Sequence, residues 1–146
     1  MAFGQPMPAL ANSPTVTIPT LETSILQASI EAYNEGNALA EQGNVEGAIA
    51  AFESAIALDE RNADAYYNLG YWLSAQNQLI EAETAYRAAL QLMPFDSQSH
   101  YNLGLVLAQQ GQRAEAEVML RRSLLLDPAN AAAASYLQYL TEPTSL

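Results

Sequence analysis

A Tyr-Asn dipeptide recurs at a fixed spacing of 34 residues, and each copy is followed by a glycine at the same offset. The three copies are Tyr33-Asn34 with Gly36, Tyr67-Asn68 with Gly70, and Tyr101-Asn102 with Gly104. A period of this length indicates stacked supersecondary units whose hydrophobic faces are buried only by their neighbours. The chain therefore divides into three repeats that begin at residues 29, 63 and 97, and repeat positions below are counted from these residues.

Small and large residues recur at the same positions of every repeat. Small residues hold positions 8, 20 and 27, while large apolar residues hold positions 11 and 24. The full set is Gly36, Gly70, Gly104; Ala48, Ala82, Ala116; Ala55, Ala89, Ser123; Leu39, Leu73, Leu107; and Phe52, Tyr86, Leu120. Two closely crossing helices need this pattern, because small residues let the backbones approach and large ones fill the space beside them. Each repeat is thus predicted to be a pair of packed helices.

Residues suited to turns and caps separate the expected helices. Gly43 and Gly111 stand between the two helices of repeats one and three, and Asn77 takes this place in repeat two. Glycine, and next asparagine, tolerates the left-handed conformation that commonly ends a helix. Pro94 and Pro128 prevent two of the second helices from continuing. The residues expected to cap helix N-termini are Thr20, Asn44, Asn62, Asp96 and Asn130.

Longer motifs match in register as well. They are Tyr-Tyr-Asn-Leu-Gly at 66–70, His-Tyr-Asn-Leu-Gly at 100–104, Leu-Met-Pro at 92–94 and Leu-Asp-Pro at 126–128. With the 34-residue period, they resemble the tetratricopeptide repeat family. The resemblance covers 29–130 and implies an all-α, right-handed solenoid of three helix-turn-helix repeats with a C-terminal capping helix. Repeat one departs from the family pattern at Ala32, Glu35 and Glu60, as expected for a terminal repeat without a neighbour on one side.

The predicted organisation places a tail at each end of the array. Residues 1–20 hold four of the seven prolines and no charged side chain, so this stretch is expected to be disordered. The predicted parts are a tail at 1–20, an extended first helix with repeat one at 21–62, repeat two at 63–96, repeat three at 97–130, the capping helix at 131–140 and a tail at 141–146.

The charge balance excludes two kinds of partner. The net charge is −11, from 16 acidic and 5 basic residues. A nucleic-acid-binding protein needs a basic face that neutralises phosphates, and an anionic membrane surface would repel this chain. We therefore expect neither nucleic acid nor a membrane as partner.

No pattern typical of catalysis, metal binding or cofactor binding stands out. The chain has no cysteine, and its only histidine, His100, occupies packing position 4, where Tyr66 stands in the repeat before. The glycines follow the repeat instead of forming a phosphate-binding loop. The sequence therefore predicts no enzyme activity, no catalytic residue, no metal site and no cofactor.

A binding groove is the remaining kind of site. The first helices of stacked repeats line the concave side of such arrays, so residues that recur on them away from the packing positions face the groove. Tyrosine offers a wide amphipathic contact at little loss of rotamer entropy, and an asparagine amide both donates to and accepts from a peptide backbone. The candidate groove residues are Tyr33, Asn34, Asn37, Asp64, Tyr67, Asn68, Tyr71, Gln98, Tyr101, Asn102 and Leu105.

The resemblance adds a role for the asparagines at position 6. In the family these side chains often contact a bound peptide, which carries over to Asn34, Asn68 and Asn102. The alternative is that the recurring tyrosines and asparagines serve the stability of the repeats. For Trp72, at position 10, core packing is favoured over contact with a ligand.

The position of the basic residues constrains the ligand. Family members that bind chaperone C-termini hold the carboxylates with lysines and arginines on the first helices. Here all five basic residues are arginines, and they lie on the second helices or, for Arg61, in a turn, while Asp64 faces the groove. We therefore expect a protein interaction module or assembly scaffold that binds a neutral or basic peptide segment.

Two further expectations concern assembly and compartment. The alternative function is self-association through the terminal helices, including a weak homodimer through Tyr136, Tyr139 and Leu140 of the capping helix, since one neighbour cannot bury all three. No long apolar segment or complete signal peptide is apparent, so a cytoplasmic location is expected. Export is the alternative, if Ala9-Leu10-Ala11 is the end of a cleaved signal.

Overall fold

The computed structural model describes residues 1–6, 18 and 20–142, and seven α-helices account for most of them. The helices are α1 (Leu21–Glu41), α2 (Val45–Leu58), α3 (Ala63–Ala75), α4 (Leu79–Leu92), α5 (Ser97–Gln109), α6 (Arg113–Leu126) and α7 (Ala131–Thr141). The predicted all-α array of helix-turn-helix repeats with a capping helix is confirmed. Most of the predicted N-terminal tail, the Ala9-Leu10-Ala11 motif and residues 143–146 lie outside the described residues.

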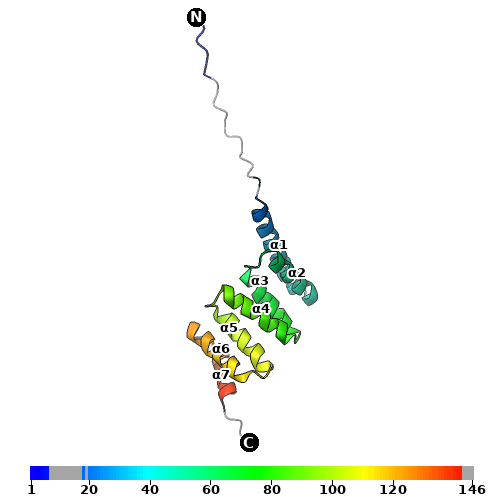
Figure 1. Ribbon diagram of the computed structural model, residues 1–146, viewed down its shortest axis with the longest axis vertical. Helices are drawn as coiled ribbons and strands as arrows, with labels where there is room; N and C mark the ends of the chain where they lie inside the picture. Colours follow the sequence, from blue (N-terminus) through cyan, green and yellow to red (C-terminus); the bar gives the residue numbers. More distant parts are fainter. Residues whose placement is uncertain (7–17, 19, 143–146) are drawn as a thin grey trace.

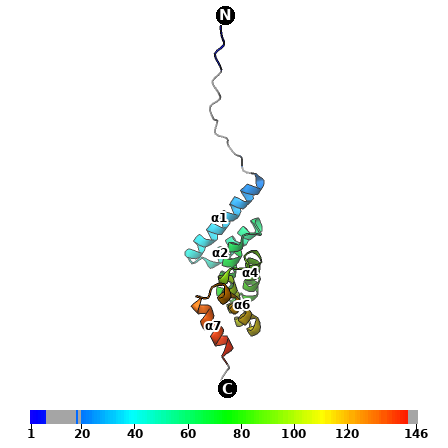
Figure 2. The same ribbon diagram turned by 90° about the vertical axis from the view of Figure 1, so that its left-hand side faces the viewer.

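The helices stack in the order of the sequence. The closest packing is within the pairs α1–α2, α3–α4 and α5–α6, which we call repeats one, two and three, and each pair also packs on the next. Figure 1 shows the pairs following one another, with α1 and α7 at opposite ends. In Figure 2, α1 crosses from the upper right to the left, α7 lies on the left, and α4 and α6 lie on the right. We call the face formed by α1, α3 and α5 the inner face, and the face formed by α2, α4 and α6 the outer face.

The recurring small and large residues make the core, as predicted. Phe52, Tyr86 and Leu120, at position 24, are almost completely buried, with exposed fractions of 0–1%. Each packs over the glycine at position 8 of its own repeat. A Cβ atom on Gly36 would lie 2.6 Å from the ring of Phe52, closer than packed atoms can approach. The glycine is therefore required by the helix crossing.

The predicted turns and caps are also present. Asn77 has a φ of 62°, the same left-handed conformation that Gly43 and Gly111 adopt in the other repeats. The side chains of the five predicted capping residues accept hydrogen bonds from backbone N–H groups at the starts of α1, α2, α3, α5 and α7. These caps satisfy N–H groups that have no partner inside the helix.

The first helix is longer than the repeat requires. Residues 21–28 precede the first repeat and add about two helical turns to α1. They bring apolar side chains to the surface, since Leu21 is 78% exposed and Leu26 is 50% exposed. At the other end Leu140 is buried while Tyr139 is 69% exposed, so the expectation that α7 cannot bury all its large residues is correct.

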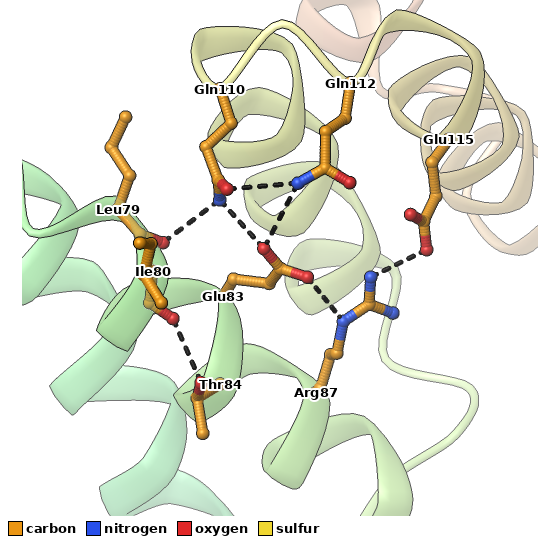
Figure 3. Close-up of polar contacts among 8 residues, drawn as sticks. All are labelled: Leu79, Ile80, Glu83, Thr84, Arg87, Gln110, Gln112 and Glu115. Atoms are coloured by element: carbon orange, nitrogen blue, oxygen red, sulfur yellow. Dashed lines mark hydrogen bonds and ion pairs between the residues drawn. The ribbon is translucent and has the colours of Figure 1, made fainter.

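A polar network on the outer face joins repeats two and three (Figure 3). The Arg87 guanidinium donates to Glu83 at 2.9 Å and to Glu115 of the next repeat at 2.6 Å. Nε2 of Gln110 donates to the other oxygen of Glu83 at 2.9 Å. The Glu115 contact is the main cause of the raised pKa of Arg87. Burial acts to raise the pKa of Glu83, but the hydrogen bonds from Gln110 and Arg87 outweigh it and lower that pKa.

None of the helices in the described ranges is both long enough and apolar enough to cross a membrane. The cellular compartment itself stays a prediction.

Candidate binding groove on the inner face

The Tyr-Asn pairs form a line of hydrogen bonds along the inner face. Nδ2 of Asn68 donates to the Tyr33 hydroxyl at 3.4 Å and to Oδ1 of Asn37 at 2.9 Å. Nδ2 of Asn102 donates to the Tyr67 hydroxyl at 3.1 Å. Each of these two asparagines thus binds the repeat before its own. Part of the recurrence therefore serves the stacking of repeats, which was the alternative interpretation of these residues.

The same hydrogen bonds decide what the asparagines and tyrosines can offer a ligand. Both hydrogens of Asn68 Nδ2 are used, so its Oδ1 is left as an acceptor for an N–H group. Burial raises the pKa of the Tyr67 hydroxyl, which keeps its proton and can donate while it accepts from Asn102. Asn34 belongs to the first repeat and is exposed. The inner face therefore presents an amide oxygen and hydroxyls, a suitable set for an extended main chain.

Several predicted groove residues surround a depression between α1 and α3. This α1–α3 depression has a volume of about 500 Å³. Its lining residues are Asn37, Ala40, Glu41, Tyr67, Asn68, Tyr71 and Trp72. The exposed ring of Tyr71 meets Trp72 edge to face, with 5.2 Å between ring centroids. Trp72 is half-buried and packs against the core, as the favoured interpretation predicts, and it also lines this depression. Contact of Trp72 with a ligand stays a prediction.

A second depression lies near the turns that follow α2 and α4. This turn-side depression has a volume of about 590 Å³. Its lining residues are Leu26, Ile30, Tyr33, Asn34, Asp59, Arg61, Asn62, Ala63, Asp64, Leu92 and Met93. Arg61 is the only basic residue among the described residues that line the two depressions. Two carboxylates, Asp59 and Asp64, line the same depression, so the acidic side chains there outnumber the single basic one.

The candidate residues of the third repeat line neither of these two depressions. Tyr101, Asn102 and Leu105 are half-buried and Gln98 is exposed. The line of Asn-to-Tyr hydrogen bonds ends here, because α7 carries Tyr136 where the repeats carry asparagine. Burial, followed by the nearby hydroxyls of Tyr139 and Tyr101, raises the pKa of Tyr136. The structure thus gathers candidates of repeats one and two around the two depressions, while repeat three is joined to them through the bond from Asn102 to Tyr67.

Residues missed from the sequence lie mainly in the turns and in the α1 extension. Leu26, Leu92 and Met93 give the turn-side depression an apolar wall. Leu26 precedes the first repeat and Met93 belongs to a turn, so neither recurs at a first-helix position. The recurrence of residues at first-helix positions therefore gave no signal for them.

His100 is buried and takes part in packing. Its side chain is 6% exposed, and its Nε2–H donates to the carbonyl oxygen of Pro94 at 3.0 Å. This hydrogen bond holds the turn after α4 against the start of α5. The geometry matches the packing role expected from position 4.

Solved structures with the same fold include several tetratricopeptide repeat domains. The Arabidopsis OM64 TPR domain is 22% identical, with a TM-score of 0.77 over 80% of this chain and 97% of that one. The second TPR domain of human RPAP3, solved in complex with the HSP70 peptide SGPTIEEVD, is 25% identical, with a TM-score of 0.77 over 82% and 99%. A mutant Thermobaculum terrenum O-GlcNAc transferase matches 84% of this chain with only 23% of its own length, at 24% identity and a TM-score of 0.71.

A search among curated proteins found no match. Family models do match the sequence itself. The TPR repeat model covers residues 36–75, and the tetratricopeptide repeat model covers residues 63–96 and 97–130. These matches span most of the described helices and agree with the helix pairs, the turns and the core seen in the structure. The chain belongs to the tetratricopeptide repeat family.

Proposed function

We propose that this chain is a protein interaction module whose inner face binds a neutral or basic peptide segment. The observation that carries the proposal is the chemistry of the α1–α3 depression. Its free acceptors are the amide oxygen of Asn68 and the carboxylate of Glu41, and the rings of Tyr71 and Trp72 provide apolar contact area. Such a surface favours backbone N–H groups and cationic side chains over carboxylates.

Helix composition supports the same charge preference. No lysine or arginine lies on α1, α3 or α5, whereas Asp64 and Glu41 lie on these helices. The RPAP3 domain binds an acidic peptide, so the shared fold does not determine the charge of the ligand. Two of the five arginines, Arg87 and Arg121, pair with glutamates on the outer face.

The test is a binding assay with nine-residue peptides of constant apolar content and varied net charge, including SGPTIEEVD. We expect neutral and basic peptides to bind at least roughly tenfold more tightly than SGPTIEEVD. Tyr71→Ala should abolish most of this binding, because Tyr71 is exposed, lines the depression and takes no part in the Asn-to-Tyr hydrogen bonds. Tyr139→Ala, an exposed tyrosine outside the groove, is the matched control. Tightest binding of the acidic peptide would refute the charge preference.

Self-association through the terminal helices is the second candidate. The apolar residues exposed on the α1 extension favour it, since Leu21 is 78% exposed and Leu26 is 50% exposed. On α7 only Tyr139 remains as a large exposed apolar side chain among the described residues. Sedimentation of Leu26→Glu and Tyr139→Ala variants separates the two ends, because only the variant at the contact would abolish a dimer.

We assign no catalytic role to this chain. The small repeat domain offers binding surfaces, and its only histidine is used in packing. Absence of turnover with any nucleotide-sugar or ester substrate in purified protein is the expected result.

A further inference from the structure

Position 25 on the outer face carries opposite charges in the two inter-repeat contacts, whereas the facing position 19 is a glutamate in both. Between repeats two and three, Arg87 at position 25 binds Glu115 at position 19 of the next repeat (Figure 3). Between repeats one and two, the same positions hold Glu53 and Glu81. Two carboxylates therefore stand where the next contact has an arginine and a glutamate. Neither Glu53 nor Glu81 has an ion pair within the described part of the chain.

These two carboxylates flank an apolar groove between α2 and α4. This α2–α4 groove has a volume of about 270 Å³. Its lining residues are Glu53, Tyr66, Leu69, Leu73, Ile80, Glu81, Thr84 and Ala85. Ile80 is 72% exposed at its edge. An apolar groove between two unpaired carboxylates is complementary to a surface that carries an arginine between apolar side chains.

The outer side of α6 is such a surface. Val118, Arg121, Arg122 and Leu125 are three or four residues apart and share one face of the helix. Val118 is 54% exposed and Leu125 is 81% exposed. Arg121 is paired with Glu117 at 2.7 Å, while Arg122 is exposed and has no ion pair among the described residues. Neither α2 nor α4 carries this combination, because the residues equivalent to Val118, Arg122 and Leu125 are Ala50, Ser54 and Ala57 in α2, and Thr84, Ala88 and Gln91 in α4.

We propose that the α2–α4 groove binds the basic face of α6 from a second copy of this chain. Arg122 enters between Glu53 and Glu81 and takes the place that Arg87 has in the next inter-repeat contact, while Val118 or Leu125 covers the apolar floor. Groove and basic face lie on the same outer face, so a two-fold arrangement satisfies both contacts in one dimer. The small volume of the groove, about 270 Å³, favours a weak, reversible dimer. This contact is independent of the inner face and of any peptide bound there.

Sedimentation velocity of the full chain tests the proposal, in about 150 mM salt so that the repulsion of the net negative charge is screened. We expect a dimer that forms with rising concentration. Arg122→Glu should weaken it at least roughly tenfold, and so should the double variant Glu53→Arg/Glu81→Arg. An equal mixture of the two variants should restore the dimer. In the mixed dimer, each contact joins one acidic and one basic surface, so both contacts again have opposite charges.

Matched controls change the same charge elsewhere. Arg61→Glu and Glu35→Arg/Glu60→Arg alter exposed residues outside both surfaces and should leave association unchanged. A protein that stays monomeric at millimolar concentration would overturn the proposal. A dimer that survives Arg122→Glu but is lost in Leu26→Glu would also overturn it, and would assign the contact to the α1 extension. Failure of the mixture to restore association would exclude the pairing of Arg122 with the groove.

Discussion

The contact between repeats one and two and the contact between repeats two and three have the same packing but different polar chemistry. On the inner face, an asparagine donates to a tyrosine of the preceding repeat in both contacts. On the outer face, Arg87 joins Glu83 and Glu115 in the second contact. Among the described residues, the first contact has no equivalent ion pair; Nε2 of Gln76, just after α3, donates to Glu46 of α2 at 3.3 Å. The repeat therefore fixes the core while leaving the outer polar positions free to serve either stability or association.

The largest effect is expected from the packing positions, where burial differs along the array. Leu107 at position 11 of repeat three is completely buried, whereas Leu39 at the same position of repeat one is half-buried. Leu107→Ala should lower the free energy of unfolding by about 3 kcal/mol, because it removes buried methyl groups and leaves a cavity. Urea denaturation followed by circular dichroism measures this. If Leu39→Ala were equally damaging, the terminal repeat would be packed as tightly as the third.

A smaller effect is expected from the network of the second contact. Arg87→Ala should lower the free energy of unfolding by roughly 0.5–1 kcal/mol, since partly exposed ion pairs contribute little individually. Arg121 occupies the same position in repeat three but pairs only within its own helix, so Arg121→Ala should cost less. Equal losses in the two variants would mean that the bond to Glu115 does not stabilise the contact between repeats.

Building the same ion pair into the contact between repeats one and two should raise the free energy of unfolding. Glu53→Arg places an arginine opposite Glu81 and reproduces the pair of Arg87 and Glu115. We expect the free energy of unfolding to rise by about 0.3–0.5 kcal/mol, because a repulsive pair becomes an attractive one. Glu60→Arg, which makes the same charge change in a turn, is the control. A loss of stability specific to Glu53→Arg would contradict the equivalence of the two contacts.

The smallest effect is expected on the free energy of unfolding when the pH is lowered. The pKa of Glu83 is lowered in the folded protein, so its contribution to stability is present above the unfolded value of about 4.3 and is lost as the pH falls through the lower folded value. The difference in unfolding free energy between wild type and Glu83→Gln should therefore shrink on going from about pH 6 to about pH 3. Urea titrations at several pH values measure it. A difference that does not change over this range would mean that Glu83 carries no such linkage.

The sequence predicted the fold well because the core positions repeat. Three copies of the same small and large residues leave one arrangement of crossing helices, and Asn77 could be assigned to a left-handed turn by comparison with Gly43 and Gly111. The role of Asn68 and Asn102 could not be assigned, because recurrence is expected both for contacts with a ligand and for contacts with the preceding repeat. Contact with the preceding repeat is shown only by the distances from these asparagines to Tyr33 and Tyr67.

The shape of the groove was less predictable. Which candidates line a depression depends on how the α1 extension and the turns after α2 and α4 approach one another, and these segments lie outside the repeating positions. The opposite charges at Glu53 and Arg87 were visible in the aligned repeats. Their significance required the knowledge that position 25 faces position 19 of the following repeat, which the bond from Arg87 to Glu115 supplies.

The placement of Trp72 offers a fluorescence test for binding at the α1–α3 depression. It is the only tryptophan in the chain, it lies at the wall of the α1–α3 depression, and the ring of Tyr71 stands edge-on beside it. A ligand that displaces water from this wall would shift the wavelength and intensity of indole emission without any attached dye. Events on the outer face would leave that emission unchanged, so one optical signal separates ligand capture from contact between copies.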